Sequence, residues 1–503
     1  MGKIIVIGAG PAGMMAAIAA SEKGADVSLL ESNEKAGKKL FITGKGRCNL
    51  TNDCPTDEFF SHVVSNPKFL FSSVYSFDHD EVKKFFEENG CPLKTERAER
   101  VFPVSDKSAD VISALERKLK MNGVRFIKNC RVAGILRETA VLSDDADAAE
   151  VEIQDVELCR EGSDAQNKLH AGVNTSKKEK KKLQQKYCVK GVLLENGEKI
   201  YSDAVIVATG GVSYPVTGSD GNFFRILTTF GHSVKPLHPA LVPLVIKDEN
   251  CRKMQGLALK NISIELKLGK KTVSEGFGEL LFTHFGISGP LILTASSEYS
   301  RKYGGLSKML DANNAIKKDQ SKKFDKSNDF GHNENVCVNG ETADLYIDLK
   351  PAVKAEDLEK RIIREFETNG NKLFKNYIAT LVPGRMRETF PDIAGIDPEK
   401  PVNKITREER QAIIQNLKAM HFTVSGTRDF NEAIITSGGI NVKEVDPHTM
   451  ESKLAKGLFF AGEMLDVDAY TGGFNLQNAW STGHAAGIAA AEPPAELSSE
   501  NNN

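Results

Sequence analysis

The stretch KIIVIGAGPAGMMAAIAASEKGADVSLLE, residues 3–31, decides the fold. A β-branched run at Lys3–Gly8 predicts a buried strand, and an Ala- and Met-rich segment at Pro11–Lys23 predicts a helix that Gly24 ends. The segment Ala25–Glu31 has the pattern of a second strand. Strand, helix and strand within about thirty residues are typical of a βαβ unit.

The turn between this strand and helix has the spacing G-x-G-x-x-G, and each glycine has its own role. Gly8 permits a tight turn, Gly10 lets the backbone approach a pyrophosphate, and Gly13 lets helix and strand pack closely. The helix N-terminus offers free N–H groups and a partial positive charge to phosphates. An acidic residue at the end of the second strand accepts hydrogen bonds from ribose hydroxyls and disfavours the 2′-phosphate of NADP. The segment therefore predicts a dinucleotide site formed by Gly8, Gly10, Pro11, Ala12, Gly13 and Glu31.

Two later segments favour FAD over NAD as the dinucleotide. Val205–Gly211 is a strand that ends in glycines, and Gly457–Glu463 is a second one. The glycine turn that follows begins a helix near Phe474, whose N-terminus can face the N1–C2=O edge of a flavin and stabilise the negative charge of its reduced form. NAD-only enzymes do not need this C-terminal return. The expected contacts are Ala208, Thr209, Gly210, Gly462, Glu463, Asp466, Gly473, Phe474, Asn475 and Leu476.

Composition excludes several classes of protein. The chain has 503 residues, of which 40% are hydrophobic and 27% charged, and its formal net charge is −2. That charge gives no global field for nucleic acid or anionic membrane. With no signal peptide pattern, the chain is expected to be cytoplasmic, a monomer or homodimer, with no membrane and no stable protein partner implied.

The cysteines and other ligand-type residues predict no metal site. Eight cysteines are present, and no two have C-x-x-C spacing. Free thiols are therefore expected, which argues against the disulfide-reductase branch of flavoenzymes. No cluster of His, Cys, Asp and Glu has metal-ligand spacing.

The predicted organisation is α/β: a discontinuous Rossmann-like FAD-binding domain with inserted β and helical domains. The first comprises residues 1–235 and 425–503, the β domain residues 236–350 and the helical domain residues 351–424. Two polar insertions are expected, at about 138–188 and 311–340. The first contains a lysine run that could contact RNA, although the acidic run nearby favours a solvated loop.

The chain resembles a known family at several motifs. These are Lys38–Asn52 (KKLFITGKGRCNLTN), Glu99–Pro103, Thr209–Gly221, Pro239–Leu244, Gly278–Pro290 and Thr471–Gly487. They are similar to the signature of the HI0933-like flavoproteins, also called the BaiN/YhiN-type or "aminoacetone oxidase family" proteins. The resemblance covers almost the whole chain, apart from the two insertions. It implies bound FAD in a two-dinucleotide-binding-domain flavoprotein fold, with a β-barrel-like insert and a helical insert.

The resemblance also implies a reaction, the reduction of carbon–carbon double bonds. Family members are linked to bile-acid steroid intermediates and to a uridine of large-subunit ribosomal RNA, which becomes dihydrouridine. Because the chain has no second G-x-G-x-x-G, NADH or NADPH is expected as a transient electron donor without a Rossmann domain of its own.

Four residues are candidates for chemistry. Cys48 could donate the proton that alkene reduction needs, with packing as the alternative, and Arg47 could orient cofactor or substrate oxygens. His284 and Tyr214 follow or lie in glycine turns, and each has a structural alternative. Further cofactor contacts are expected at Lys39, Thr43, Gly44, Gly46, Arg47, Asn49 and Val132.

The leading hypothesis is thus an FAD-dependent oxidoreductase that reduces a conjugated C=C bond, in a small enone or in ribosomal RNA. One alternative is an oxidase that passes electrons from a small amine or alcohol to O₂. Another is a binding module that keeps FAD without catalysis.

Overall fold

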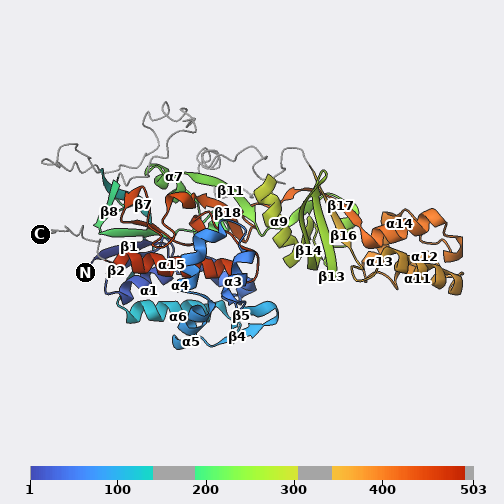
Figure 1. The fold of residues 1–503 in the computed structure, drawn as a ribbon, viewed down its shortest axis with the longest axis horizontal. Helices are drawn as coiled ribbons and strands as arrows, with labels where there is room; N and C mark the ends of the chain where they lie inside the picture. The colour runs from blue at the N-terminus through green and yellow to red at the C-terminus, as the bar shows by residue number, and fades with distance from the viewer. Residues whose placement is uncertain (1, 140–186, 304–341, 493–503) are drawn as a thin grey trace, which may run out of the picture. The chain divides into compact units, whose positions relative to one another are not determined.

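The computed structural model of the chain describes residues 2–139, 187–303 and 342–492 (Figure 1). The two predicted polar insertions lie almost entirely outside these residues. The chain divides into two compact units, one formed by Met1–Lys235 with Gly438–Asn503 and the other by Pro236–Ser437.

The first unit is built on a five-stranded parallel sheet with the order β20-β10-β1-β2-β6. β1 (Lys3–Ile7) and β2 (Asp26–Leu30) flank the helix α1 (Pro11–Glu22), which confirms the predicted βαβ unit. The carboxyl ends of parallel strands meet at one edge of the sheet, so the loops after these strands gather there. The other strands are β6 (Arg125–Ile127), β10 (Ala204–Val207) and β20 (Leu458–Phe460).

The C-terminal helix α15 (Phe474–Ala491) lies along α1 (Figure 1). A Cβ atom on Gly483 would lie 2.3 Å from the carbonyl oxygen of Ala12, and one on Gly487 would lie 2.3 Å from that of Ala16. The contact four residues later in α15 is made with the residue four positions later in α1, so α1 and α15 run parallel. The start of α15 therefore lies at the same edge of the sheet as the start of α1.

Two continuous segments of the first unit each hold two strands. Residues 199–209 form β9 (Lys199–Tyr201), which pairs with β8 (Tyr187–Leu194), and then β10 in the parallel sheet. The break lies at Asp203, whose carboxylate accepts the backbone N–H of Lys3 at 2.7 Å. Residues 124–135 likewise hold β6 and the start of β7, which belong to different sheets.

The remaining elements of the first unit cover this sheet and carry its loops. β3, β5 and β4 form a small antiparallel sheet. β19, β8, β7 and β9 form a mixed sheet, in which β19 pairs with β8 in parallel and the other pairs are antiparallel. The bounds are β3 (Thr51–Asn52), β4 (Leu93–Glu96), β5 (Arg100–Pro103), β7 (Val132–Thr139), β19 (Ala455–Lys456), α2 (Lys38–Ile42), α3 (Thr56–Phe59), α4 (Phe71–Ser76), α5 (His79–Glu88), α6 (Ser108–Met121) and α7 (Asn222–Thr228).

The second unit contains a closed six-stranded barrel, which confirms the predicted β-barrel-like insert. Its strand order is β12-β15-β14-β13-β16-β17, with every neighbouring pair antiparallel. β17 follows the helical segment and closes the barrel, so the barrel strands are not contiguous in sequence. The bounds are β12 (Leu244–Ile246), β13 (Ala258–Leu268), β14 (Lys271–Phe282), β15 (Gly286–Ser288), β16 (Ala343–Asp348) and β17 (Met420–Thr427).

Helices between β16 and β17 share one apolar core with the barrel. α11 buries Leu358, Ile362 and Phe366, one face of an amphipathic helix. α14 begins at a capping box in which Thr406 and Glu409 exchange hydrogen bonds. The helices between β16 and β17 are α11 (Ala355–Thr368), α12 (Phe374–Ile378), α13 (Met386–Ala394) and α14 (Arg407–Lys418), and α8 (Glu249–Lys253) and α9 (Pro290–Tyr303) come earlier in the unit. β11 (Val234–Ala240) pairs with β18 (Ile435–Ile440) where the chain passes between units.

The packing of α15 predicts a pH dependence of stability. His484 stacks on Phe77 at 4.2 Å, its Nδ1 atom has no hydrogen-bond partner among the described residues, and burial lowers its pKa to about 4. The unfolded chain therefore binds more protons between its ordinary pKa of about 6.5 and about 4. The free energy of unfolding should fall by up to roughly 3 kcal/mol as pH falls through that window.

Urea unfolding of the wild type and of His484→Phe, at neutral and mildly acidic pH, tests this expectation. The variant keeps the ring stack and lacks the titrating group, so its loss of stability in acid should be smaller. An equal loss in both proteins would contradict the assignment to His484.

Candidate functional site

The β1–α1 turn leaves an open position only at its middle glycine. Gly8 has a φ of +99°, and a Cβ atom there would lie 2.6 Å from the carbonyl oxygen of Ala208. A Cβ atom on Gly13 would lie 1.8 Å from the carbonyl oxygen of Gly8. Around a Cβ atom on Gly10, by contrast, no protein atom lies within 4 Å. Gly10 is also the N-cap of α1, so open space adjoins the free N–H groups of that helix, as an anionic group requires.

Glu31 stands beside this turn at the end of β2. Its carboxylate accepts the backbone N–H of Ala9 at 2.8 Å and that of Asn33 at 2.8 Å, and the amide of Asn33 donates at 2.7 Å. These bonds fix a largely buried acid next to the open position. Carboxylate oxygens can accept further hydrogen bonds, so Glu31 is suited to ribose hydroxyls.

Three of the loops at this edge of the sheet meet in one ion-pair network. The ammonium of Lys39, on α2, lies 2.6 Å from Glu463 Oε2 and 2.5 Å from Ser213 Oγ. Ser213 in turn donates to Glu463 Oε1 at 2.9 Å. Glu463 follows β20 and Ser213 follows β10, so the network joins three segments that the sequence separates. Ser213 was not singled out by sequence reasoning, because a serine two residues after a glycine pair carries no specific signal.

Removing the cation of this network should weaken cofactor binding. Lys39→Met keeps the apolar stem and removes the ammonium group beside Glu463, which makes the surroundings of the phosphate position more negative. FAD affinity should fall by about tenfold, equivalent to roughly 1.4 kcal/mol. Fluorescence titration of the apoprotein with FAD measures this, and Lys35→Met, at an exposed neighbouring position, should change little. Equal affinities in the two variants would contradict the role of Lys39.

A second glycine turn precedes α15. Gly473, its N-cap, has a φ of +103°, and a Cβ atom there would lie 2.3 Å from the carbonyl oxygen of Thr51. The carbonyl oxygen of Gly472 accepts the amide of Asn52 at 3.1 Å. The side-chain amide of Asn475 accepts the N–H of Ala469 at 2.9 Å and donates to the C=O of Ala469 at 2.8 Å. Both polar atoms of this side chain therefore have partners within the protein. Any cofactor contact of Asn475 would therefore come from its backbone.

The loop that carries the candidate residues Arg47 and Cys48 has an unusual backbone conformation. Gly44, Lys45, Gly46 and Cys48 all have positive φ. Arg47 lies 2.5 Å from a carboxylate oxygen of Glu96 and 2.5 Å from one of Asp106, and these hydrogen bonds raise its pKa. Its guanidinium also lies 4.1 Å from the ring centroid of Phe102. The N–H donors of the Arg47 guanidinium thus already bind the carboxylates of Glu96 and Asp106.

Cys48 is fully buried, and burial raises the pKa of its thiol. A substrate can contact the thiol only if the loop around it moves. The other described cysteines are free thiols as well, as predicted.

The other predicted residues lie in several places. Ala208 and Gly210 follow β10, and Tyr214, in the next loop, has a φ of +50°. Asp466 accepts the amide of Asn66 at 3.0 Å. Val132 begins β7 and is largely buried, and His284 belongs to the second unit, between β14 and β15. Thr43, Asn49, Thr209 and Leu476 lie in the loops and helix start described above.

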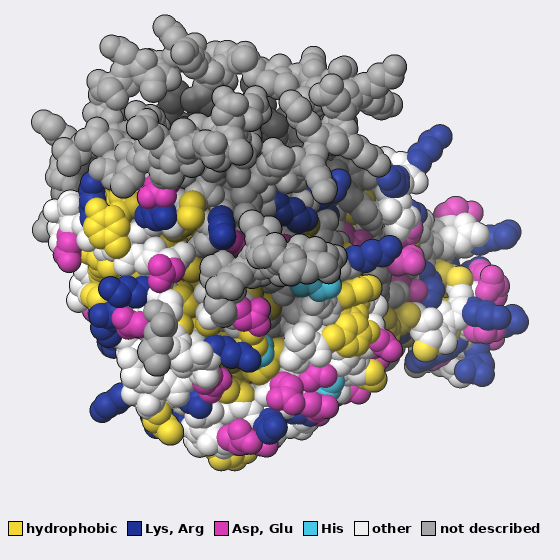
Figure 2. All heavy atoms as spheres, turned by 60° about the vertical axis from the view of Figure 1, so that its left-hand side comes forward, with side chains coloured by type: hydrophobic (Ala, Val, Ile, Leu, Met, Phe, Trp, Pro, Cys, Tyr) yellow, Lys and Arg dark blue, Asp and Glu magenta, His cyan; other side chains and the backbone are white. Residues whose placement is uncertain are grey.

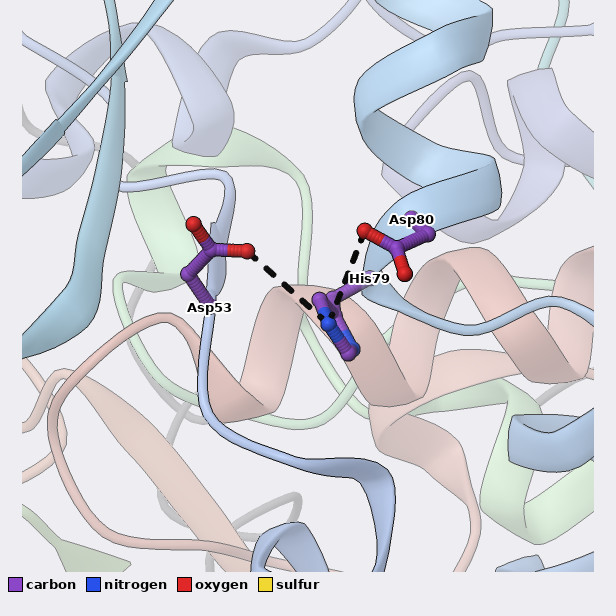
Figure 3. Close-up of side chains that lie close together, drawn as sticks. All are labelled: Asp53, His79 and Asp80. Carbon is purple, nitrogen blue, oxygen red and sulfur yellow. Dashed lines mark ion pairs between the residues drawn. The ribbon is translucent and has the colours of Figure 1, made fainter.

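One group of side chains has the composition of a metal site. Asp53, His79 and Asp80 lie together in Figure 3, with His79 Nε2 3.8 Å from Asp53 and 3.7 Å from Asp80. The ammonium of Lys83, however, bonds the same oxygen atoms of both carboxylates. Because an ammonium group of the protein already bridges the two carboxylates, the group does not require a metal ion.

The residues at the edge of the parallel sheet fit FAD. The open position at Gly10 suits a pyrophosphate, Glu31 suits a ribose, and the start of α15 lies at the same edge for the flavin. No helix among the described residues has both the length and the apolarity to cross a membrane.

The chain is similar to known proteins over almost its whole length. The model of the HI0933-like protein Rossmann domain matches residues 2–163 and 158–489. The 3-dehydro-bile acid delta(4,6)-reductase of Clostridium scindens is 27% identical over 497 residues, which cover 98% of this chain and 100% of the relative. The ribosomal RNA dihydrouridine synthase of Escherichia coli is 25% identical over 482 residues, 96% of each chain. Among solved structures, a 3-ketosteroid delta1-dehydrogenase of Sterolibacterium denitrificans matches 98% of this chain and 100% of its own, with a TM-score of 0.46 and 12% identity. The chain therefore belongs to the HI0933-like family of Rossmann-domain proteins, and it is an FAD-dependent oxidoreductase.

Proposed function

We propose that the chain reduces a conjugated C=C bond of a small, flat enone, with NADH or NADPH as a transient electron donor. The observation that carries the proposal is the single FAD cradle closed by the start of α15. A helix N-terminus beside the flavin stabilises the negative charge of its reduced form, the form that delivers hydride. The described residues contain one five-stranded parallel sheet with one glycine-rich cradle, which FAD would fill. A nicotinamide donor would therefore have no cradle of its own and would bind only for the time of electron transfer.

The residues of the cradle have defined tasks in this proposal. Gly10 and the start of α1 bind the pyrophosphate, Glu31 binds a ribose, and Lys39 offsets the charge of Glu463. Bound FAD supplies the hydride when reduced. Cys48 packs beneath its loop, and Arg47 holds that loop through Glu96 and Asp106.

The name of one relative, the ribosomal RNA dihydrouridine synthase of Escherichia coli, suggests a second candidate substrate. This substrate is a uridine in ribosomal RNA. The charge distribution favours the small enone. On the face shown in Figure 2, acidic and basic side chains are interspersed over the described residues. A polyanion binds best to a surface on which Lys and Arg side chains are gathered.

Anaerobic stopped-flow absorbance tests the proposal. The FAD-loaded protein is mixed first with NADH or NADPH and then with cyclohexenone or with a uridine-containing RNA. Bleaching by a nicotinamide donor and recovery of flavin colour by the enone are expected. Recovery by RNA alone would favour the second candidate. Absence of bleaching with both donors would remove the transient-donor step, and peroxide release from an amine or alcohol would indicate an oxidase.

A further inference from the structure

An imidazole and a phenol flank the glycine turn at the start of α15. His62, in the short helical turn Phe60–His62, stacks on Phe474 with ring centroids 4.3 Å apart and an interplanar angle of 13°. The ring of Tyr470 lies edge-on, 6.4 Å from that of His62. Their backbones are joined as well, because Tyr470 N–H donates to the carbonyl oxygen of His62 at 2.9 Å, and Val63 bridges Ala469.

The ring stack places His62 next to the turn that faces the cofactor. A Cβ atom on Gly472 would lie 2.6 Å from Cε2 of Phe474, so the Phe474 ring lies against Gly472. His62 stacks on the same ring, and the ring of Phe59 lies 5.7 Å from it in an edge-on contact. The backbone of Gly472 is held in turn by Asn52. His62 is thus packed beside the glycine turn through its contacts with Phe474 and Tyr470.

His62 is both accessible and able to titrate. Its side chain is 34% exposed, in contrast to the buried thiol of Cys48. The titratable groups that face it are Glu58, whose carboxylate lies 3.9 Å from Nε2, and Tyr470. Burial lowers its pKa, and Glu58 partly opposes this effect. An imidazole is the side chain that exchanges protons most readily near neutral pH.

We propose that His62 is the acid that protonates the substrate carbon during reduction of the C=C bond. This inference rests on the proposed function. One alkene carbon takes the hydride that reduced FAD supplies, and the π electron pair forms a C–H bond at the other carbon with the proton from the His62 imidazolium. FAD is left oxidised, the alkene is reduced by two electrons, and neutral His62 regains its proton from water.

The two half-reactions separate this role from a structural one. In His62→Gln, bleaching by NAD(P)H should be unchanged, whereas recovery of flavin colour with cyclohexenone should slow by at least about 100-fold. The wild-type recovery rate should increase as pH falls through the pKa of His62, and the variant should lack this dependence. His421→Gln is the matched control, because His421 is an exposed histidine paired with Asp344 in the second unit.

A second variant protects the test against a folding defect. His62→Phe keeps the stack on Phe474 and cannot donate a proton, so it should bind FAD normally and show the same slow recovery. A wild-type recovery rate in either variant, or a loss seen only in Tyr470→Phe, would overturn the inference. Failure of the wild type itself to recover with any enone would instead remove the proposed function.

A measurement independent of activity is also available. In ¹³C-edited NMR of the FAD-loaded protein, the histidine resonance missing from His62→Gln should titrate below the ordinary histidine pKa of about 6.5. Titration at or above that value would contradict the environment described for His62.

Discussion

Gly10→Ala is expected to leave the apoprotein folded and to weaken FAD binding by at least about tenfold, equivalent to roughly 1.4 kcal/mol. No protein atom lies within 4 Å of a Cβ atom at this position, and the backbone has a φ of −82°, which alanine adopts freely. The new methyl group therefore meets only the space that the pyrophosphate needs. Because alanine is a poorer N-cap than glycine, a stability change within about 1 kcal/mol is expected.

Fluorescence titration with FAD and thermal unfolding of the apoprotein measure the two effects separately. Gly2→Ala is the control, because its Cβ atom would lie 3.8 Å from the carboxylate of Asp203, an ordinary contact outside the cradle. Unchanged FAD affinity in Gly10→Ala would show that the pyrophosphate does not lie against this turn.

Gly483→Ala should destabilise the folded chain by about 2 to 3 kcal/mol, as overpacking in a core does. A Cβ atom there would lie 2.3 Å from the backbone carbonyl oxygen of Ala12, which cannot rotate away. Intrinsic helix propensity predicts the opposite sign, a gain of about 1 kcal/mol when glycine becomes alanine inside a helix. The direction of the change therefore decides whether the contact between α1 and α15 dominates.

Urea unfolding of the apoprotein measures this difference. Ala485→Gly, in the same helix, calibrates the propensity term and should cost about 1 kcal/mol. If Gly483→Ala were more stable than the wild type, the close parallel packing of α15 on α1 would be wrong, and with it the position of the second glycine turn.

The sequence predicted the parts of the site that depend on backbone geometry. Glycine is the only residue type that fits the close contacts at positions 8 and 13. A G-x-G-x-x-G pattern directly after a strand is therefore a specific signal. The strand residues at β10 and β20 and the start of α15 at Phe474 also follow from apolar runs that end in glycines. Local pattern suffices in these cases because the constraint acts on the residue itself.

Side-chain partners could not be predicted in the same way. Arg47 looked suited to a cofactor or substrate oxygen, and the fold brings it to Glu96 and Asp106. Cys48 looked suited to proton donation, and the fold buries it. A guanidinium or thiol has the same chemistry wherever it lies, so its partner is set by which distant segments pack around it.

The sequence by itself therefore determined the βαβ unit, its glycine turn and the family. Only the tertiary structure decided that β17 closes the barrel, that Lys39, Ser213 and Glu463 form one network, and that His62 stacks on Phe474. The physical reason is one of range. Glycine turns and apolar periodicity are properties of neighbouring residues, whereas these contacts join segments hundreds of residues apart, whose proximity is fixed by the packing of whole elements.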